Sequence, residues 1–430
     1  MSEPEPVSLD LHVRGIGESP TLAINQRCAE LQRKGVRVHR LGLGQSPFPV
    51  PSLVVEALRT NAHRKEYLPV RGLPELREAV AEFHRRTDRL DLPAQGVLVG
   101  PGSKELMFLL QVCFYGEIVV PTPCWVSYVP QARILGREVR RLPTSFEDGW
   151  KVTPQGLDRT LSAEHDPSRP RLLVLNYPAN PHGGTYSPAE LEDIARVARK
   201  YSLLLLSDEI YGQLHYAGNH VSVGRFYPEG TILSSGLSKW CGAGGWRLGT
   251  FAFPPRLGWL LDAMAAVASE TYTAVSTPIQ YAAVTAFRGG AELERYLCHA
   301  RRILRALGDR CAETLLRAGI RLHRAEGAFY LFPDLGPLAQ RLAARGIRTS
   351  DVLCERLLDE VGVAVLPGSA FERRADELTL RLAFVDFDGA RALAASETTP
   401  LDQPLPDSFL EQLCAGPLEA CRRLADWAAG

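Results

Sequence analysis

The sequence predicts an α/β protein whose larger part is a mostly parallel sheet covered by helices on both faces. Short apolar runs typical of strands alternate with helical patterns between residues 97 and 253. Such alternation indicates a parallel sheet, because each crossover helix packs against one face of it. After residue 292 the pattern changes to one long helical region, then short strands and a helix. This change predicts a second, smaller α+β lobe.

The N-terminal segment is predicted to contain a helix, a short strand and a loop. The helix begins near residue 19 and ends at Gly35, because its apolar residues recur at helical spacing. Residues 36–43 alternate in polarity as a strand does, and three prolines between residues 47 and 51 indicate a loop. We expect the first 50 residues to join the second lobe in space.

Seven strands are predicted for the main sheet, at residues 97–100, 117–120, 138–142, 171–176, 203–206, 231–234 and 248–253. Helices are predicted at 51–60, 73–86, 125–135 and 188–201, and another begins at residue 101. In the second lobe we expect helices at 292–318 and 350–359 and strands at 327–332, 363–366 and 378–384. Ligands of parallel sheets bind beyond the carboxyl ends of the strands, where several polar motifs of this sequence lie.

Composition excludes several classes of function. Lys+Arg and Asp+Glu both number 49, so the net charge is zero and favours neither nucleic acid nor an anionic membrane surface. The acidic, proline-rich start is not a secretory signal, and no apolar run is long enough to span a membrane. Nine scattered cysteines without a Cys-x-x-Cys pair indicate reduced thiols in a cytoplasmic protein rather than a metal site.

One lysine organises the candidate site. Lys239 directly follows Ser238, and Arg247 lies eight positions further on. A lysine in a water-poor pocket has a lowered pKa and can act as a nucleophile toward aldehydes. A phosphorylated aldehyde cofactor also needs hydroxyls, backbone amides and a fixed cation around its phosphate, which Ser235, Ser238 and Arg247 can supply. Taken alone, this motif is more often a solvated lysine in a glycine-rich loop.

Other motifs at strand ends suit the same kind of cofactor. Gly102 and Ser103 open a helix, whose N-terminus offers free amides and the positive end of its dipole to a phosphate. Asp208 closes an apolar run, and a buried carboxylate there needs a partner such as a protonated pyridine nitrogen. The ordinary alternatives are a helix cap and a turn aspartate.

Three further residues can contact a flat heteroaromatic ring. Tyr211 and Asn180 can hydrogen-bond a phenolic oxygen on it, and Trp125 can stack on its face. Asparagine before proline more often marks a turn, and a tryptophan more often packs in the core. The interpretation therefore depends on the ordered set of motifs and not on any one of them.

Over residues 20–385 this ordered set resembles the class I/II aminotransferases of the aspartate aminotransferase superfamily, which are fold-type-I pyridoxal-phosphate enzymes. The resemblance implies pyridoxal 5'-phosphate as cofactor and Lys239, Asp208 and Tyr211 as catalytic residues. Lys239 would be the Schiff-base lysine and proton shuttle, and Asp208 would pair with the pyridine nitrogen. The implied cofactor-binding set is Gly102, Ser103, Lys104, Trp125, Asn180, Asp208, Tyr211, Ser238, Lys239 and Arg247, with Tyr67 from the neighbouring subunit.

The resemblance also implies how a substrate is held. Arg381 would clamp the α-carboxylate of an amino acid, a task that suits its planar bidentate geometry, with Gly44 and Asn180 beside it. Because Tyr67 would reach the partner's phosphate, we expect a homodimer with shared active sites. Small-molecule amino acids and 2-oxo acids are the expected partners.

Some positions depart from the family's usual pattern. Cys124, His182 and the pair Trp240–Cys241 replace residues more common there, and residues 269–276 contain no arginine. We therefore expect a neutral, aromatic or otherwise non-standard substrate side chain in preference to a dicarboxylate, with Trp240, Cys241 and Cys124 either reshaping the pocket or packing behind the cofactor.

Three parts of the chain are predicted. Residues 1–50 are the N-terminal arm and part of the small domain, residues 51–299 the cofactor-binding domain with the seven-stranded sheet, and residues 300–430 the C-terminal small domain. The expected function is an aminotransferase. The alternative is an enzyme of specialised metabolism that catalyses elimination, replacement or cyclisation of an amino-acid substrate. The same cofactor residues serve all of these reactions, so they do not distinguish them from transamination. A cofactor-binding regulator is the third class.

Overall fold

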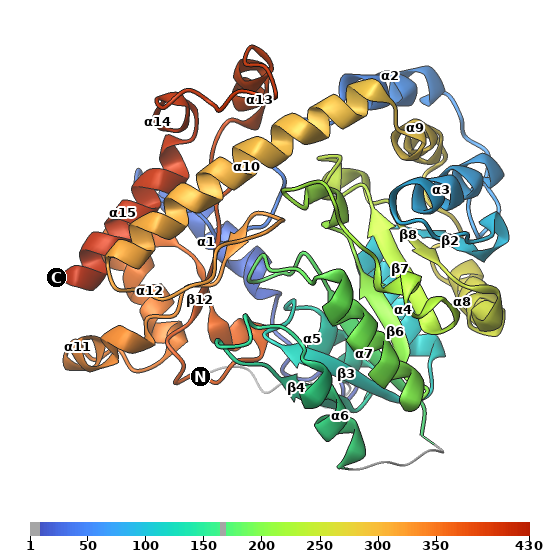
Figure 1. Ribbon diagram of the computed structural model, residues 1–430, viewed down its shortest axis with the longest axis horizontal. Coiled ribbons are helices and arrows are strands. Elements are labelled where there is room, and N and C mark those ends of the chain that lie inside the picture. Colours follow the sequence, from blue (N-terminus) through green and yellow to red (C-terminus); the bar gives the residue numbers. More distant parts are fainter. Residues whose placement is uncertain (1–8, 164–168) are drawn as a thin grey trace.

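The computed structural model describes residues 9–163 and 169–430, so the acidic start at residues 1–6 lies outside the described residues. A seven-stranded sheet forms the centre of the larger part (Figure 1). Its strands are β2 (Val97–Gly100), β3 (Glu117–Thr122), β4 (Val139–Pro143), β5 (Arg171–Asn176), β6 (Leu204–Asp208), β7 (Thr231–Gly236) and β8 (Gly249–Ala252). The spatial order is β2-β8-β7-β6-β5-β3-β4, and β8 runs antiparallel to both its neighbours while the other pairs are parallel. The predicted sheet is confirmed.

Helices cover both faces of this sheet because its central strands are apolar on both sides. In β5, Leu172 and Val174 pack with α4 (Ser103–Cys113), α5 (Tyr128–Ile134) and α8 (Gly258–Glu270), whereas Leu173 and Leu175 pack with α6 (Pro154–Ser162) and α7 (Pro188–Lys200). Helices α2 (Ser52–Asn61), α3 (Pro74–Thr87) and α9 (Thr277–Arg288) complete the layer beyond β2 and β8. Two-sided burial explains why the strands are continuous apolar runs.

Helices α6, α8 and α9 were not predicted from the sequence. Helix α8 is almost entirely apolar, so it lacks the polar face that makes a surface helix recognisable. Its Leu260, Leu261 and Met264 are buried against the sheet layer. Tertiary burial and not an amphipathic pattern therefore stabilises this helix.

The smaller part contains two small sheets. Strand β1 (His39–Arg40) pairs in parallel with β10 (Val363–Ala364), and β11 (Leu366–Pro367), β12 (Leu380–Ala383) and β9 (Tyr330–Leu331) form an antiparallel sheet in that order. Strand β1 is shorter than the predicted 36–43 and lies with the C-terminal strands, as expected. Helices α1 (Pro20–Arg33), α11 (Ala339–Ala344) and α12 (Ser350–Val361) surround these sheets.

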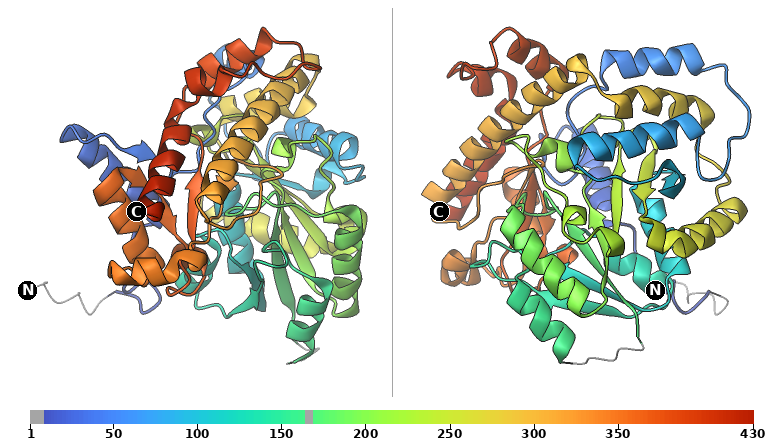
Figure 2. Two further views of the ribbon diagram at one scale, coloured as in Figure 1. Left: turned by 60° about the vertical axis from the view of Figure 1, so that its left-hand side comes forward. Right: turned by 45° about the vertical axis from the view of Figure 1, so that its right-hand side comes forward.

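Helix α10 (Ala291–Arg317) connects the two parts and runs from the α2–α9 end to the small sheets (Figures 1 and 2). The C-terminal tail, which the sequence predicted only as long and proline-interrupted, forms α13 (Gly389–Glu397), α14 (Phe409–Leu413) and α15 (Ala415–Ala429). Helix α15 lies along α10 with Leu418, Cys421 and Leu424 buried. In the described part of the chain, no helix is long and apolar enough to cross a membrane.

Candidate active site

A cavity of about 510 Å³ lies beyond the carboxyl ends of the central parallel strands, between the large sheet and the small sheets. Asn176 and Asp208, the last residues of β5 and β6, lie on its wall. Every predicted site residue lines this cavity except Gly102 and Tyr67: Gly44, Ser103, Lys104, Trp125, Asn180, Asp208, Tyr211, Ser238, Lys239, Arg247 and Arg381. The topology therefore brings together residues that are more than 300 positions apart.

Lys239 follows β7 and is partly exposed to the cavity. Its Nζ donates a hydrogen bond of 2.7 Å to the backbone carbonyl of Gly44. Burial, and next the positive charge of Arg381, lower the pKa of Lys239 to about 8, while Asp208 opposes the change. The amine is therefore much closer to its neutral, nucleophilic form at neutral pH than an ordinary lysine is.

Asp208 is buried at the end of β6 and faces the cavity. Burial raises the pKa of its carboxyl to about 6, and the hydrogen bonds from Tyr128 and the Ile210 amide oppose the rise. The Tyr128 hydroxyl donates to Oδ2 at 2.6 Å. A positively charged group beside this carboxylate would compensate the cost of burying its charge.

Tyr128 is a residue that the sequence reasoning missed. It begins α5, three positions after Trp125; its amide donates to the Trp125 carbonyl at 3.2 Å, and its ring packs edge-on against that indole with centroids 5.3 Å apart. The three-residue separation from Trp125 was the only signal in the sequence that could have placed Tyr128 near the site. Its contact with Asp208, 80 positions away, arises only from the fold.

The N-terminus of α4 and Arg247 form a positively charged cradle. Gly102 caps the helix with φ 94°, and a Cβ there would lie 2.2 Å from Nη2 of Arg247, so only glycine fits. Arg247 itself has left-handed backbone geometry with φ 54° and donates to the carbonyls of Gly244 at 2.9 Å and Pro101 at 3.3 Å. Burial and the charge of Arg247 lower the pKa of Lys104. The concentrated positive charge and the helix dipole suit a phosphate.

Ser238 lines the cavity near this cradle, but Ser235 does not. Ser235 is buried within β7, where it pairs with Thr250 of β8. The role suggested for Ser235 is therefore unsupported by the geometry, and Ser238 is the side-chain hydroxyl of that motif that faces the cavity.

Arg381 of β12 is 1% exposed and points into the cavity. Its Nη1 donates to Oδ1 of Asn180 at 3.3 Å and its Nη2 donates to the carbonyl of Gly42. Its Nε has no hydrogen-bond partner, and in residues 9–163 and 169–430 no carboxylate forms a salt bridge with this guanidinium. Burial lowers its pKa. Such an uncompensated buried cation is suited to an anionic ligand.

Tyr330 of β9 is the second cavity residue that the sequence reasoning missed. Its hydroxyl lies 2.7 Å from the hydroxyl of Tyr211. The same oxygen lies so close to Gly44 that a Cβ at position 44 would be 2.0 Å from it. No local signal in the sequence pointed to Tyr330, because its neighbours come from positions 44, 211 and 381.

Two predictions about the surroundings of the cavity have different outcomes. Trp240, Cys241 and Cys124 are buried and do not line the cavity, so of the two alternatives the structure favours packing behind it over reshaping the pocket. Trp240 instead stacks on Phe83 in the core, with ring centroids 6.1 Å apart. Tyr67 lies outside the cavity with 89% of its surface exposed. Its expected contact with a partner subunit stays a prediction.

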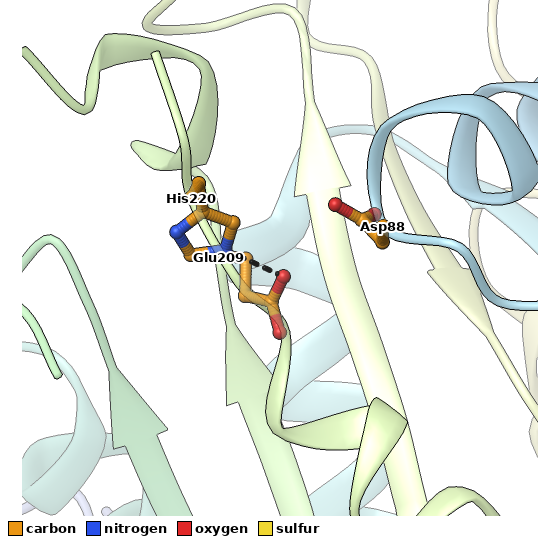
Figure 3. A group of neighbouring side chains, drawn as sticks. All are labelled: Asp88, Glu209 and His220. Carbon is orange, nitrogen blue, oxygen red and sulfur yellow. Dashed lines mark hydrogen bonds and ion pairs between the residues drawn. The ribbon is translucent and has the colours of Figure 1, made fainter. Parts of the chain in front are cut away.

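Asp88, Glu209 and His220 form a buried group, and Glu209 directly follows Asp208 at the end of β6 (Figure 3). His220 Nε2 is 2.9 Å from Oε2 of Glu209, while Oε1 accepts hydrogen bonds from Ser207 and Ser222 at 2.7 and 2.6 Å. Burial opposes both charges, but the mutual contact prevails: it lowers the pKa of Glu209 and raises that of His220. We interpret the His220–Glu209 pair and the two serine hydrogen bonds as the contacts that hold the residue after Asp208 in place, whereas Asp88 pairs with His84 at 2.7 Å.

Comparisons with known proteins identify relatives of similar sequence and fold. The family model described as aminotransferase class I and II matches residues 37–394. An aspartate/prephenate aminotransferase of Thermus thermophilus is 35% identical over 368 residues, 84% of this chain and 91% of that protein. An aspartate aminotransferase of Bacillus sp. is 32% identical over 84% of this chain and 91% of its own length. The solved Thermus thermophilus aspartate aminotransferase with maleate has a TM-score of 0.81 at 32% identity and covers 97% of this chain and 99% of that one.

Proposed function

Because the chain belongs to the aminotransferase class I and II family, we propose that it binds pyridoxal 5'-phosphate in the 510 Å³ cavity and moves an amino group between an L-amino acid and a 2-oxo acid there. The chain is an aminotransferase that acts on amino acids and oxo acids. The proposal concerns the cofactor, the residues that hold it and the way in which they work. The family match favours transamination over the elimination, replacement or cyclisation alternatives.

One observation carries the proposal. Lys239, Asp208 and Arg381 face one cavity, and none of the three forms a salt bridge within the described residues. Their hydrogen-bond partners are neutral, and keeping three charged groups in one cavity without a salt bridge is costly. Pyridoxal phosphate with an amino-acid substrate would compensate all three, since it offers an aldehyde to the amine, a protonated ring nitrogen to the carboxylate and an α-carboxylate to the guanidinium.

The residues of the large sheet fit the cofactor. Trp125, Tyr211 and Asn180 line the cavity, where the indole would stack on the ring and the other two side chains would hydrogen-bond its phenolic oxygen. Ser103 and Lys104 at the start of α4, with Ser238 and Arg247, would hold the phosphate. When bound, the cofactor supplies an electron sink for the electrons left at the substrate's α-carbon.

The protein's own part in catalysis is to orient the substrate and to move one proton. Arg381 and Asn180 would fix the α-carboxylate, which sets the direction of the bond from the α-carbon to its proton. Lys239, with its lowered pKa, would take that proton and deliver it to C4′, the aldehyde carbon of the cofactor. Asp208, a buried carboxylate supported by Tyr128, would keep the ring nitrogen protonated.

The substrate's side chain is the open part of the proposal. The relatives named above are aspartate and aspartate/prephenate aminotransferases, which favours a dicarboxylic amino donor. The absence of arginine in residues 269–276 removes one arrangement for holding a second carboxylate there and is the remaining ground for predicting a neutral or aromatic substrate. Titration of the purified protein with aspartate and phenylalanine distinguishes the two, because the preferred donor converts the cofactor at the lower concentration.

We also propose a cytoplasmic homodimer in which Tyr67 reaches the neighbouring subunit's cofactor phosphate. The 89% exposure of this aromatic side chain supports that proposal. Mixing inactive Tyr67→Ala and Lys239→Ala chains should restore part of the activity, since one of the two sites in a mixed dimer is then complete. Absence of any restoration despite demonstrated subunit exchange contradicts shared sites.

Borohydride reduction followed by peptide mapping tests the cofactor assignment. We expect the cofactor to be fixed on the peptide that contains Lys239, because that amine has the low pKa and faces the cavity. Lys104 and Lys200 serve as internal controls, one at the cavity wall and one on the surface of α7. Label on either of them would overturn the assignment.

A further inference from the structure

We infer that Tyr330 is a positioning residue whose hydroxyl completes a hydrogen-bond chain through Tyr211 into the cavity. The inference rests on the proposed function, because the end of that chain is the cofactor's phenolic oxygen. It adds to the proposed site a residue that belongs to the small sheet and acts through a tyrosine of the large part.

The position of Tyr330 is fixed by the small sheet. Strand β9 pairs with β12 so that Tyr330 lies opposite Ala383, two residues from Arg381. The Tyr330 side chain is 1% exposed, and the Arg381 guanidinium lies 4.8 Å from its ring centroid. The backbone of Gly44 closes the other side. The phenol therefore has little freedom to turn away from Tyr211.

The two hydroxyls have only two protons to share. Tyr330 Oη lies 2.7 Å from Tyr211 Oη, and either oxygen can be the donor. In the described part of the chain this is the one hydrogen bond of the Tyr330 hydroxyl. A phenolate oxygen in the cavity accepts a hydrogen bond from the Tyr211 hydroxyl, which uses the only proton that Tyr211 can donate. Tyr330 must then donate its own hydrogen bond to the Tyr211 oxygen for both bonds to persist.

Such a chain strengthens the hydrogen bond at its far end. A donor that itself accepts a hydrogen bond is more polarised and donates more strongly in a low-dielectric site. Tyr330 therefore makes Tyr211 a better donor to the phenolic oxygen. A stronger donor stabilises the deprotonated oxygen, which lowers the pH at which the lysine-bound cofactor loses its shared proton.

Tyr330→Phe isolates this effect, because it keeps the ring beside Arg381 and removes only the hydroxyl. We expect the pH midpoint of the holoenzyme's colour change to rise by about 0.5 unit, roughly a threefold change in the proton equilibrium, as for loss of one modest hydrogen bond. Tyr211→Phe should raise the midpoint further. In the Tyr211→Phe background, Tyr330→Phe should add nothing, since the chain is already cut.

Tyr186→Phe is the matched control, because the Tyr186 hydroxyl also makes one hydrogen bond, 3.0 Å from the Val152 amide, and lies outside the cavity. Its midpoint should equal that of the wild type. An unchanged midpoint in Tyr330→Phe with the cofactor bound, or shifts that simply add in the double variant, overturns the inference. A wild-type protein that binds no pyridoxal phosphate instead overturns the proposed function and the inference with it.

Discussion

The two walls of the cavity are built differently. The wall from the large sheet carries Lys239 and Asp208 at the ends of strands whose hydrogen-bonded neighbours lie on both sides. The wall from the small sheets carries Arg381 and Tyr330 on short strands. Each wall is held by its own sheet, but β6 and β7 have five and six residues whereas β12 and β9 have four and two. The second wall is therefore held by shorter strands together with contacts across the cavity.

Three hydrogen bonds join the two walls: Lys239 to Gly44, Arg381 to Asn180 and Tyr211 to Tyr330. In each pair one residue comes from each wall, so these hydrogen bonds couple the positions of the two walls. We call the wall from the large sheet the large wall, the wall from the small sheets the small wall, and the three hydrogen bonds between them the joint. Changes in the large wall should affect cofactor chemistry, while changes in the small wall should affect substrate binding or the joint.

The largest effect is expected from Lys239→Ala. This change removes the residue that we propose moves the proton, and general acid–base catalysis by such a group contributes about 10²–10⁴-fold. We expect kcat to fall by at least that factor while pyridoxal phosphate still binds without a covalent link. Steady-state kinetics and the absorption spectrum after gel filtration check the two parts. Activity within tenfold of the wild type would contradict the assignment.

Arg381→Ala should distinguish the functions of the two walls, because it should change amino-acid binding and leave cofactor binding unchanged. Losing a desolvated bidentate ion pair costs about 2–5 kcal/mol of binding, so amino-acid affinity should fall at least thirtyfold with cofactor affinity unchanged. Arg381→Lys is the matched control, since it keeps the charge without the planar fork and should recover only part of the loss. An unaltered amino-acid affinity, measured by spectral titration, would refute the proposed carboxylate clamp.

Gly44→Ala should strain the joint between the walls. The added Cβ would lie 2.0 Å from the Tyr330 hydroxyl, so either the loop or the tyrosine must move. Overpacking of this kind costs about 1–3 kcal/mol of unfolding free energy. Gly258→Ala is the control, because no atom lies within 4 Å of its Cβ position and it lies at the start of α8. Equal free energies of unfolding for the two variants in urea would show that the Gly44 loop and Tyr330 can move apart without cost.

The smallest effect expected is the influence of the Arg381 charge on the pKa of Lys239. The rate at which Lys239 reacts with an added aldehyde should rise with pH and level off above its pKa of about 8, because only the neutral amine is nucleophilic. The charge of Arg381 is the second cause of that lowered pKa, after burial. Arg381→Gln should therefore move the midpoint upward. A midpoint near 10.5, the ordinary pKa of a lysine, in the wild type would mean that Lys239 is solvated.

The large wall could be predicted from the sequence because each of its residues follows a strand within a short motif. Asp208 ends β6 and Lys239 comes three residues after β7. The seven strands were predictable for the same reason, since two-sided burial leaves continuous apolar runs. The apolar helix α8 was not, because its exposed face also carries apolar residues such as Trp259 and Ala266, so the contrast between faces that marks a surface helix is weak.

The small wall was less accessible to sequence reasoning. Arg381 was found through the family resemblance, but Tyr330 was not, because its partner Tyr211 is 119 positions away. Tyr128 was missed for a similar reason, although it lies three positions after Trp125. The sequence left two alternatives open for Trp240 and Cys241, because nearness to Lys239 in sequence does not say which side of the chain faces the cavity; both residues are buried away from it.

A single turnover without any oxo acid tests the central claim most directly. The holoenzyme is mixed with an excess of its preferred amino acid, and the products are counted per active site. Transamination through Lys239 predicts one equivalent of the matching 2-oxo acid and conversion of the cofactor to its amine form. Release of ammonia or a cyclised product, with the cofactor still in its aldehyde form on Lys239, would contradict the account.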